Sequence, residues 1–227
     1  LEALHNLLKE KKIPISSASL GDINKKDLSQ VESIKEKDEF LGVLLGFNVK
    51  VAAEMEDLAK AKQLKLITQE VIYKIIDDYL AYVENLKKEV ELREFTKLVR
   101  PCKLALLQGY IFRQNNPAIV GVEIETGRIR TGDPLMNQEG KFLTTVKSMQ
   151  EGKENVSLAE QGQQLAMSME GVTVGRQIKE GDFLYADVPE ADFKKLKEYK
   201  QHLSKIEINL LKEIAEIKRK QNPVWGV

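Results

Sequence analysis

The sequence has little of the chemistry on which metalloproteins and disulfide-stabilised proteins depend. Its 227 residues include one cysteine, Cys102, and two histidines, His5 and His202. A single cysteine excludes an internal disulfide and favours a reducing, cytoplasmic setting. One thiol and two imidazoles far apart in the sequence do not supply the ligands of a zinc site. No apolar run approaches the roughly 18 residues of a membrane-spanning helix, so we expect neither a metal nor a membrane partner.

Nucleotide-binding and catalytic motifs are also missing. A P-loop requires Gly-x4-Gly-Lys-Ser/Thr, and the two Gly-Lys pairs of this chain continue with Phe142 and Glu154. The neighbouring carboxylates Asp77 and Asp78 would point about 100° apart on a helix, which is typical of a solvated face and not of a catalytic dyad. We therefore expect no catalytic residue and no cofactor bound to this chain.

The chain also has no net charge, and the distribution of its charged residues says little about partners. The 35 Lys and Arg residues match 35 Asp and Glu residues. Only residues 191–227 carry an excess, with nine basic side chains against five acidic ones. A phosphate-binding surface usually shows a larger local excess. The charge pattern alone therefore indicates neither a nucleic-acid nor a membrane partner.

The sequence does contain a long charged helical segment, roughly residues 68–98. Apolar residues recur at helical spacing between residues 72 and 83 and predict a broad buried face. Beyond them only Leu86 and Val90 continue the stripe, and Pro101 forbids easy continuation. We interpret the segment as a helix that runs into solvent between two dissimilar modules. The alternative is a long helix folded back on a single domain.

The residues before this segment alternate between helical and strand patterns. Strands are expected at 13–21, 40–47 and 64–67, and the second is apolar throughout, as in a strand covered on both faces. Asn24, with Asp27 three residues later, predicts a capped helix start. Helices that alternate with short apolar strands predict right-handed crossovers and a parallel sheet. This module is therefore predicted to be α/β.

From Lys103 onward, short segments rich in β-branched residues alternate with turns. The expected strands are 104–112, 119–125, 142–148, 164–169 and 183–188. Gly132-Asp133 and Gly181-Asp182 repeat one turn that leads into a strand each time. Five or more strands in about ninety residues favour a closed antiparallel barrel, with a sandwich as the alternative. Two helices follow, and Ser204 with Glu207 predicts a capping box at the second.

Candidate nucleic-acid contacts cluster on one loop of the predicted barrel. They combine aromatic, cationic and amide groups, which can stack bases and reach phosphates: Tyr110, Phe112, Arg113 and Asn115. Arg128 and Arg130 alternate across one residue of a strand and could extend this patch. The alternative is that all six are ordinary strand and turn residues.

The terminal helix combines an apolar stripe with the basic excess of the chain. The candidate partner-binding residues are Ile206, Leu210, Leu211, Ile214, Lys218 and Trp225. A groove of this kind suits an acidic peptide with one or two aliphatic anchors, because the anchors fill pockets while lysines attract the acidic flanks. The alternative is a helix packed wholly on the barrel.

Several separated segments match one protein family in the same order. They are LEAL at 1–4, GDINKKD at 21–27, VIYKIID at 71–77, RPCK at 100–103, GYIFR at 109–113, NPAIVGV at 116–122, GVTVGRQ at 171–177 and NPVWGV at 222–227. These segments resemble the third domain, the connecting helix and the last domain of the initiation factor 2/5B family of translation factors. The last two look archaeal.

The resemblance implies a fragment that holds domains III and IV of that family. Domain III would be an α/β/α sandwich with a parallel sheet at 1–68, followed by a long connecting helix at 69–98. Domain IV would be an antiparallel barrel like domain II of elongation factor Tu at 99–188, followed by two helices at 189–227. In the family the third domain usually has a strand just before the position of Leu1, so the sheet is expected to lack an edge. The GTPase domain, with its GTP and Mg²⁺, would lie upstream.

The function implied by the resemblance is a non-catalytic one in translation initiation. The barrel would bind the aminoacylated acceptor end of initiator methionyl-tRNA, and the terminal helices would bind the tail of initiation factor 1A. The module would promote the joining of the ribosomal subunits. The competing hypothesis is a protein-interaction adaptor that makes no direct contact with RNA.

Overall fold

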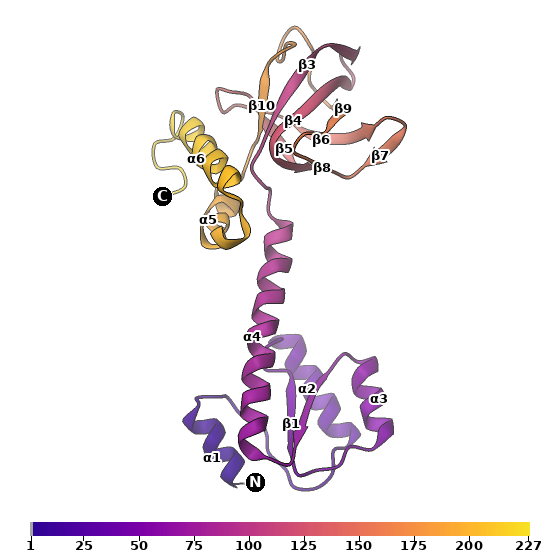
Figure 1. Cartoon of the computed structure of the whole chain (residues 1–227), viewed down its shortest axis with the longest axis vertical. Helices are drawn as coiled ribbons and strands as arrows, with labels where there is room; N and C mark the ends of the chain where they lie inside the picture. Colours follow the sequence, from indigo (N-terminus) through magenta and orange to yellow (C-terminus); the bar gives the residue numbers. More distant parts are fainter. Residues whose placement is uncertain (1) are drawn as a thin grey trace. The chain divides into compact units, whose positions relative to one another are not determined.

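The structure is a computed structural model, and it describes residues 2–227. The chain divides into two compact units, Leu1–Leu92 and Arg93–Val227. The first unit contains α1 Glu2–Glu10, α2 Lys25–Lys37, β1 Val43–Phe47, α3 Ala53–Ala61, β2 Lys65–Gln69 and most of α4 Ile72–Lys97. The helix α4 is the long helix expected from the sequence (Figure 1), and its last turn belongs to the second unit.

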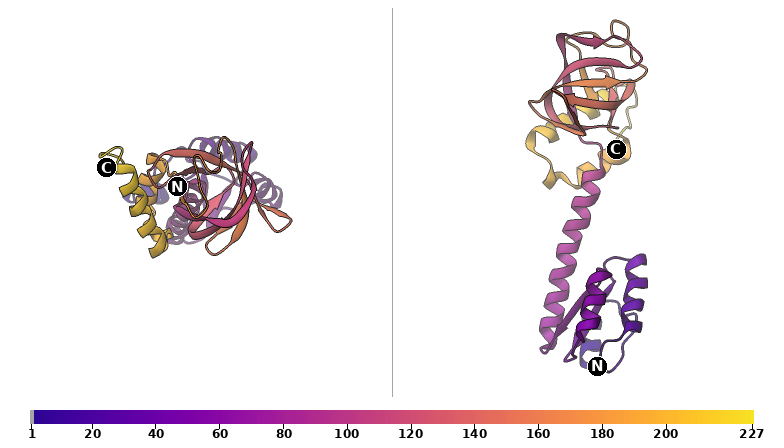
Figure 2. Two further views of the ribbon diagram at one scale, coloured as in Figure 1. Left: turned by 90° about the horizontal axis from the view of Figure 1, so that it is seen from above. Right: turned by 90° about the vertical axis from the view of Figure 1, so that its right-hand side faces the viewer.

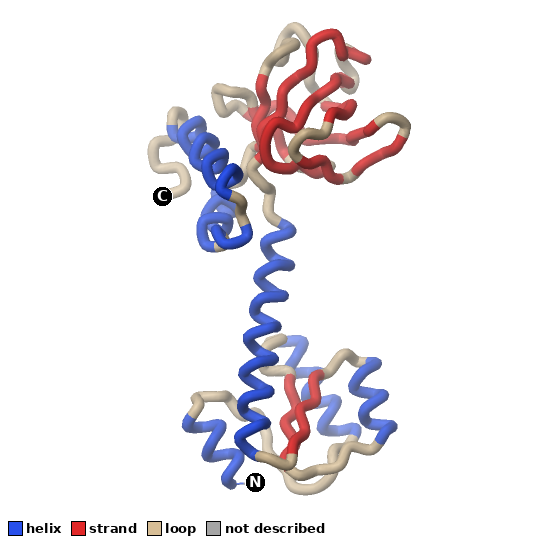
Figure 3. The backbone as a smooth tube through the Cα atoms, viewed as in Figure 1, coloured by secondary structure: helices blue, strands red, loops and turns tan. Residues whose placement is uncertain are grey.

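The first unit has three layers because both of its strands are covered on both faces. β1 and β2 pair in parallel. Val43, Leu45 and Ile67 pack with side chains of α1 and α4, whereas Leu44 and Leu66 pack with α2 and α3. Side chains alternate across a strand, so the continuous apolar pattern produces two separate cores. Figure 3 shows the two helix pairs on either side of the strands.

Residues 13–21, which were predicted as a strand, do not form one. Ile13 and Ile15 pack on the face shared by α1 and α4, and the following residues line a hollow of about 380 Å³ beside β1. The prediction was wrong because Pro14 has no N–H to donate to a ladder. The three serines and the alanine that follow also lack large apolar side chains to hold the backbone against another strand. Among the residues described, β1 pairs only with β2.

The second unit is a closed barrel followed by two helices. Its elements are β3 Cys102–Arg113, β4 Ala118–Arg130, β5 Pro134–Met136, β6 Phe142–Glu151, β7 Glu154–Val156, β8 Leu158–Glu160, β9 Gln164–Met169, β10 Phe183–Ala186, α5 Glu190–Glu198, a 3₁₀ turn Lys200–His202 and α6 Lys205–Arg219. Six strands close in the order β3-β10-β5-β6-β9-β4, and antiparallel pairing of β4 with β3 completes the ring. The right-hand view of Figure 2 shows this closure. The predicted barrel is confirmed, and the sandwich alternative is wrong.

The repeated Gly-Asp turn has the same geometry at both positions. The carboxylate of Asp133 accepts a hydrogen bond from the backbone N–H of Arg130 at 2.8 Å. The carboxylate of Asp182 accepts one from the N–H of Lys179 at 2.7 Å. The glycine before each aspartate has a positive φ, which glycine adopts readily. Each turn leads directly into a strand, β5 or β10.

Candidate nucleic-acid interface

An irregularity in β3 turns two aromatic side chains outward from the barrel. Leu106 pairs with Val122 and Ile111 with Val120, so β3 advances five residues while β4 advances two. Such a bulge breaks the ladder and redirects side chains. Tyr110 is 54% exposed as a result, and Phe112, two residues further, is 64% exposed.

The two aromatic rings lie next to each other. Their centroids are 6.4 Å apart with an interplanar angle of 65°, an edge-to-face arrangement. Gly121 on β4 leaves room beneath Tyr110, since a Cβ at this glycine would lie 2.6 Å from the Cβ of Tyr110. Because Gly121 has no side chain, Tyr110 can pack against β4 at this point, next to Phe112.

Arg113 and Asn115 continue from the aromatic pair into the hairpin between β3 and β4. Arg113 is the last residue of β3, opposite Ile119 of β4. Both side chains are exposed, and within the described part of the chain the guanidinium of Arg113 has no hydrogen-bond or ion-pair partner. The structure thus brings four of the predicted residues together at one end of the barrel: Tyr110, Phe112, Arg113 and Asn115.

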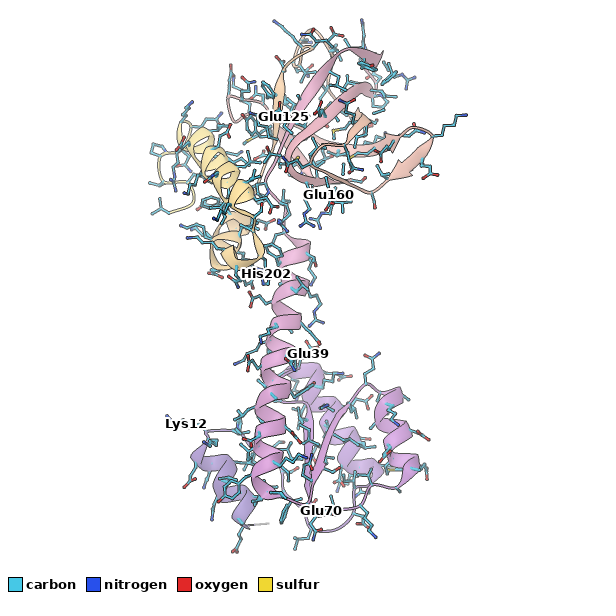
Figure 4. The ribbon with its side chains drawn as sticks, in the orientation of Figure 1. Lys12, Glu39, Glu70, Glu125, Glu160 and His202 are labelled. Atoms are coloured by element: carbon cyan, nitrogen blue, oxygen red, sulfur yellow. The ribbon has the colours of Figure 1, made fainter. Side chains whose placement is uncertain are left out.

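Arg128 and Arg130 do not join this cluster. They lie at the opposite end of β4 from the hairpin, where Arg128 is 3.9 Å from the carboxylate of Glu160 (labelled in Figure 4). The guanidinium of Arg130 donates hydrogen bonds to the backbone carbonyls of Thr96, Lys97 and Leu98. Carbonyls at a helix C-terminus lack partners within the helix, so Arg130 caps the end of α4. These bonds give Arg130, which was predicted as an RNA contact, a structural role.

Asp133 is the acidic neighbour of Arg130 and is largely buried. Its carboxylate lies 3.5 Å from the Arg130 guanidinium. Burial raises the pKa of Asp133, and the hydrogen bond and charge of Arg130 oppose that rise without cancelling it. Asp133 and Arg130 therefore stabilise the C-terminal end of α4, and they lie away from the exposed aromatic cluster.

The candidate residues of the terminal helix fall into buried and accessible groups. Leu210, Leu211 and Ile214 are buried in the same core as the barrel, whereas Ile206 is 52% exposed. Trp225 is buried too, and its ring lies 4.6 Å from that of Phe193.

Lys218 bridges the helix to the barrel. Its ammonium forms a short ion pair with Asp187 and lies 3.5 Å from the Gly140 carbonyl oxygen. Of the apolar stripe, Ile206 is therefore the residue that remains accessible, and Lys205 and Lys212 are exposed elsewhere on the same helix.

Residues 2–227 contain no cluster of three or more His, Cys, Asp or Glu side chains that could hold an ion. No helix in this range combines the length and apolar character needed to cross a bilayer. Cys102 is fully buried, and that burial raises the pKa of its thiol. His202 (labelled in Figure 4) packs against Phe95, with ring centroids 5.1 Å apart.

The loop 171–178 lies next to the aromatic cluster, but the sequence did not predict any site residue in it. The backbone N–H of Val174 donates to the carbonyl of Gln114 at 2.9 Å, which places the loop 171–178 beside the β3–β4 hairpin. Its exposed Arg176 was not among the predicted site residues. Gly171 and Gly175 indicate a turn in this loop, but no spacing in the sequence relates it to a hairpin about sixty residues earlier.

Comparison with known families matches both units of the chain. The family described as "Translation-initiation factor 2" matches residues 1–80, and "Elongation factor Tu domain 4" matches residues 100–185. These two matches agree with the division into an α/β unit and a barrel.

Comparison with individual proteins covers nearly the whole chain. "Probable translation initiation factor IF-2" of Methanopyrus kandleri is 44% identical over 228 residues, and its counterpart in Thermococcus sibiricus is 41% identical over 229 residues. Each match covers 100% of this chain and 38% of the relative. A solved structure, GDP-bound aIF5B from Aeropyrum pernix, matches 99% of this chain and 38% of that one, with 36% identity and a TM-score of 0.60. The chain, which spans about 38% of the length of these relatives, therefore belongs to the archaeal translation initiation factor IF-2 (aIF5B) family.

Proposed function

We propose that the barrel binds the aminoacylated 3′ acceptor end of initiator methionyl-tRNA on the ribosome. The observation that carries this proposal is the exposed pair Tyr110 and Phe112, next in sequence to Arg113, whose guanidinium has no hydrogen-bond or ion-pair partner among residues 2–227. Stacking on aromatic rings binds unpaired bases, and a nearby arginine reaches the backbone phosphates.

The charge of the barrel agrees with a short single-stranded ligand. Residues 101–190 carry nine basic and twelve acidic side chains, so a long duplex would be repelled over most of the surface. A 3′ terminus presents few phosphates and several splayed bases, which a small aromatic patch can accommodate.

A titration with initiator tRNA tests this proposal. The chain should bind the aminoacylated form more tightly than the deacylated form, and Phe112→Ala should weaken binding about 5- to 150-fold, the range for one lost base–aromatic stack of about 1–3 kcal/mol. Tyr73→Ala is the matched control, because Tyr73 is an aromatic residue 68% exposed in the first unit. Equal, weak binding of both tRNA forms, unchanged by Phe112→Ala, would contradict the proposal.

We further propose that the chain has no catalytic role and acts within a longer factor that promotes subunit joining. The solved relative is described as GDP-bound, and this chain contains no P-loop motif. We therefore assign GTP, its Mg²⁺ and its hydrolysis to parts of the factor outside these 227 residues. The chain alone should show no GTPase activity, and adding it to ribosomes should require the rest of the factor for subunit joining.

A second function, binding of a protein tail, is favoured by the surface of α6. Ile206 is 52% exposed at the start of the helix, and Lys205 and Lys212 are exposed on the same helix. We propose that an acidic tail of initiation factor 1A binds here, with one aliphatic anchor on Ile206. Ile206→Ser should weaken binding of an acidic tail peptide about tenfold, whereas Val71→Ser, at an exposed valine in the first unit, should not. Equal effects of the two substitutions would contradict this assignment. Tail binding without any tRNA binding would favour the adaptor hypothesis.

A further inference from the structure

The last six residues of the chain fold back over the two terminal helices. The helix α6 ends at Arg219, and residues 222–227, which we call the C-terminal strap, turn back toward α5 (Figure 1). The N–H of Trp225 donates to the carbonyl of Asn222 at 3.0 Å and closes a turn within the strap. The strap therefore has a defined backbone conformation on the surface of the helices.

One aromatic contact holds the strap on α5. The ring centroid of Trp225 lies 4.6 Å from that of Phe193, and only 8% of Trp225 and 5% of Phe193 are exposed. Gly226 packs so closely on the same ring that an added Cβ would lie 2.5 Å from it. Its φ of +70° is also one that glycine adopts far more readily than other residues. A side chain at position 226 would therefore prevent the strap from closing.

Two cations bind the backbone of the strap. The Nε of Arg219 donates to the Trp225 carbonyl at 3.0 Å, and the ammonium of Lys197 lies 3.5 Å from the Gly226 carbonyl oxygen. Among residues 2–227, neither cation forms an ion pair with a carboxylate. The strap thus places one large apolar side chain between two cations that bind oxygen atoms. An acidic peptide with an apolar anchor would use the same two kinds of contact.

The strap is attached mainly at its centre. Trp225 is buried, whereas Val224 is 71% exposed and Val227 is 80% exposed. The helices beneath the strap have their own anchors, because Leu196 of α5 and Ile214 of α6 are fully buried in the barrel core. Terminal segments with few buried contacts open at a low free-energy cost. The strap can therefore open while α5 and α6 stay packed on the barrel.

The exposed face of α6 connects Ile206 to the strap. Ile206 lies in the first turn of α6 and Arg219 in the last. At about 100° and 1.5 Å per residue, their side chains are about 140° and 20 Å apart, at the two edges of this face. Lys212 is exposed between them. A peptide that starts at Ile206 and crosses the face therefore reaches the strap after about seven extended residues.

We propose that residues 222–227 are an autoinhibitory strap, which an acidic tail peptide displaces when it binds across α6. This inference rests on the proposed binding of the initiation factor 1A tail and adds a regulation of that site. With the strap closed, Trp225 covers Phe193, and Lys197 and Arg219 bind carbonyls of the chain itself. With the strap open, a second apolar residue of the peptide takes the place of Trp225, and its acidic flanks bind the two cations.

The test is binding of a tryptophan-free synthetic peptide of the initiation factor 1A tail. Gly226→Ala keeps the strap open and should bind the peptide about tenfold more tightly than the wild-type chain, the change expected if the wild-type strap is open about one-tenth of the time. Val224→Ser is the matched control, because Val224 is an exposed residue of the same strap. This variant should bind the peptide as the wild-type chain does.

A second measurement needs no variant. Trp225 is the only tryptophan of the chain, so its emission reports the position of the strap. Saturating peptide should shift the emission of the wild-type chain to longer wavelength and increase its quenching by acrylamide, because Trp225 leaves Phe193 for solvent. In Gly226→Ala, the emission should already be shifted before the peptide is added and should change little afterwards.

The outcomes separate the strap from the function on which it rests. If the peptide binds and Ile206→Ser weakens it, but Gly226→Ala binds like the wild type and the emission of Trp225 does not move, the strap is refuted and the tail site stands. If the peptide binds neither the wild type nor Gly226→Ala, the tail-binding function is refuted, and the autoinhibition with it. Weaker binding by Gly226→Ala would also overturn the proposal, since the closed strap would then be part of the binding surface. Far-UV circular dichroism checks that each variant is folded.

Discussion

Arg100 and Glu207 form a buried ion pair, with 2.5 Å between the Nη2 and Oε1 atoms. Their side chains are 5% and 12% exposed. The Arg100 guanidinium also lies over the ring of Phe95, 4.2 Å from its centroid. Glu207 accepts a hydrogen bond from the Ser204 N–H and closes the capping box of α6. This carboxylate therefore connects the start of α6 to the residues around the α4 terminus.

Removing the Glu207 carboxylate should strongly destabilise the second unit. Glu207→Ala leaves the Arg100 charge buried without a partner and removes the capping box, so we expect a loss of about 3–5 kcal/mol in the free energy of unfolding. Glu139→Ala is the control, since its ion pair with Lys141 lies in the same unit and is exposed, so its loss should change stability little. Urea unfolding, followed by far-UV circular dichroism, measures both. Similar losses in the two variants would contradict the account.

The same pair predicts how stability depends on pH. Burial raises the pKa of Glu207, but hydrogen bonds from Ser204 and the charge of Arg100 outweigh it, so the net pKa is lowered. A lowered folded-state pKa contributes stability above the unfolded value of about 4.3, and this contribution is lost as the pH falls through the folded-state value. Glu207→Gln should therefore flatten the acid limb of the stability curve. An unchanged limb would show that other carboxylates determine it.

Arg130 is predicted to hold the last turn of α4 against the barrel. Its guanidinium donates charge-assisted hydrogen bonds to the carbonyls of Thr96, Lys97 and Leu98. A hydrogen bond of this kind typically contributes about 1.5–3 kcal/mol to the free energy of unfolding. In Arg130→Ala, the amide of Val99, which donates to Asp192, should exchange with solvent at least about tenfold faster. Arg130→Lys should not restore protection, because one ammonium cannot reproduce the planar fork of a guanidinium.

Arg128→Ala serves as the control for that experiment, because the nearest carboxylate, that of Glu160, is 3.9 Å away and both groups are accessible. Exchange at Val99 should stay at the wild-type rate in this variant. Equal acceleration in the Arg128 and Arg130 variants would contradict a specific cap on α4.

The single thiol provides a reporter of unfolding in the barrel. Cys102 is 0% exposed, and burial raises the pKa of its thiol, so the reactive thiolate is scarce in the native protein. Iodoacetamide should modify native Cys102 at least about 100-fold more slowly than the urea-unfolded chain. Labelling at the same rate in both states would show that β3 opens readily at its first residue.

Local chemistry explains what the sequence predicted well. Asn24 with Asp27 and Ser204 with Glu207 form the expected capping boxes, since those contacts depend on residues three apart. The barrel strands were also predicted correctly, because segments rich in β-branched residues alternate with turn residues along the sequence. The strand predicted at residues 13–21 was wrong because the prediction gave too little weight to Pro14, which cannot donate a hydrogen bond to a ladder.

The candidate site shows a division between local and distant contacts. Tyr110, Phe112, Arg113 and Asn115 gather because they are adjacent in sequence. The residues next to Arg130 in the sequence do not distinguish it from an arginine that faces solvent. Its partners are the carbonyls at the end of α4, about 33 residues earlier, and only the fold brings them close to it. The loop around Arg176 was missed for the same reason, because its contact with Gln114 is set by closure of the barrel.

The most direct test of the tRNA assignment is a cross-link from the 3′ end of the RNA. Aminoacylated initiator tRNA with a photoreactive nucleotide near its 3′ terminus would be irradiated with the chain, and the modified peptides mapped by mass spectrometry. The account predicts cross-links in residues 108–116 and 171–178, lost with excess unlabelled aminoacylated tRNA. Cross-links confined to α5, α6 or the first unit would contradict it.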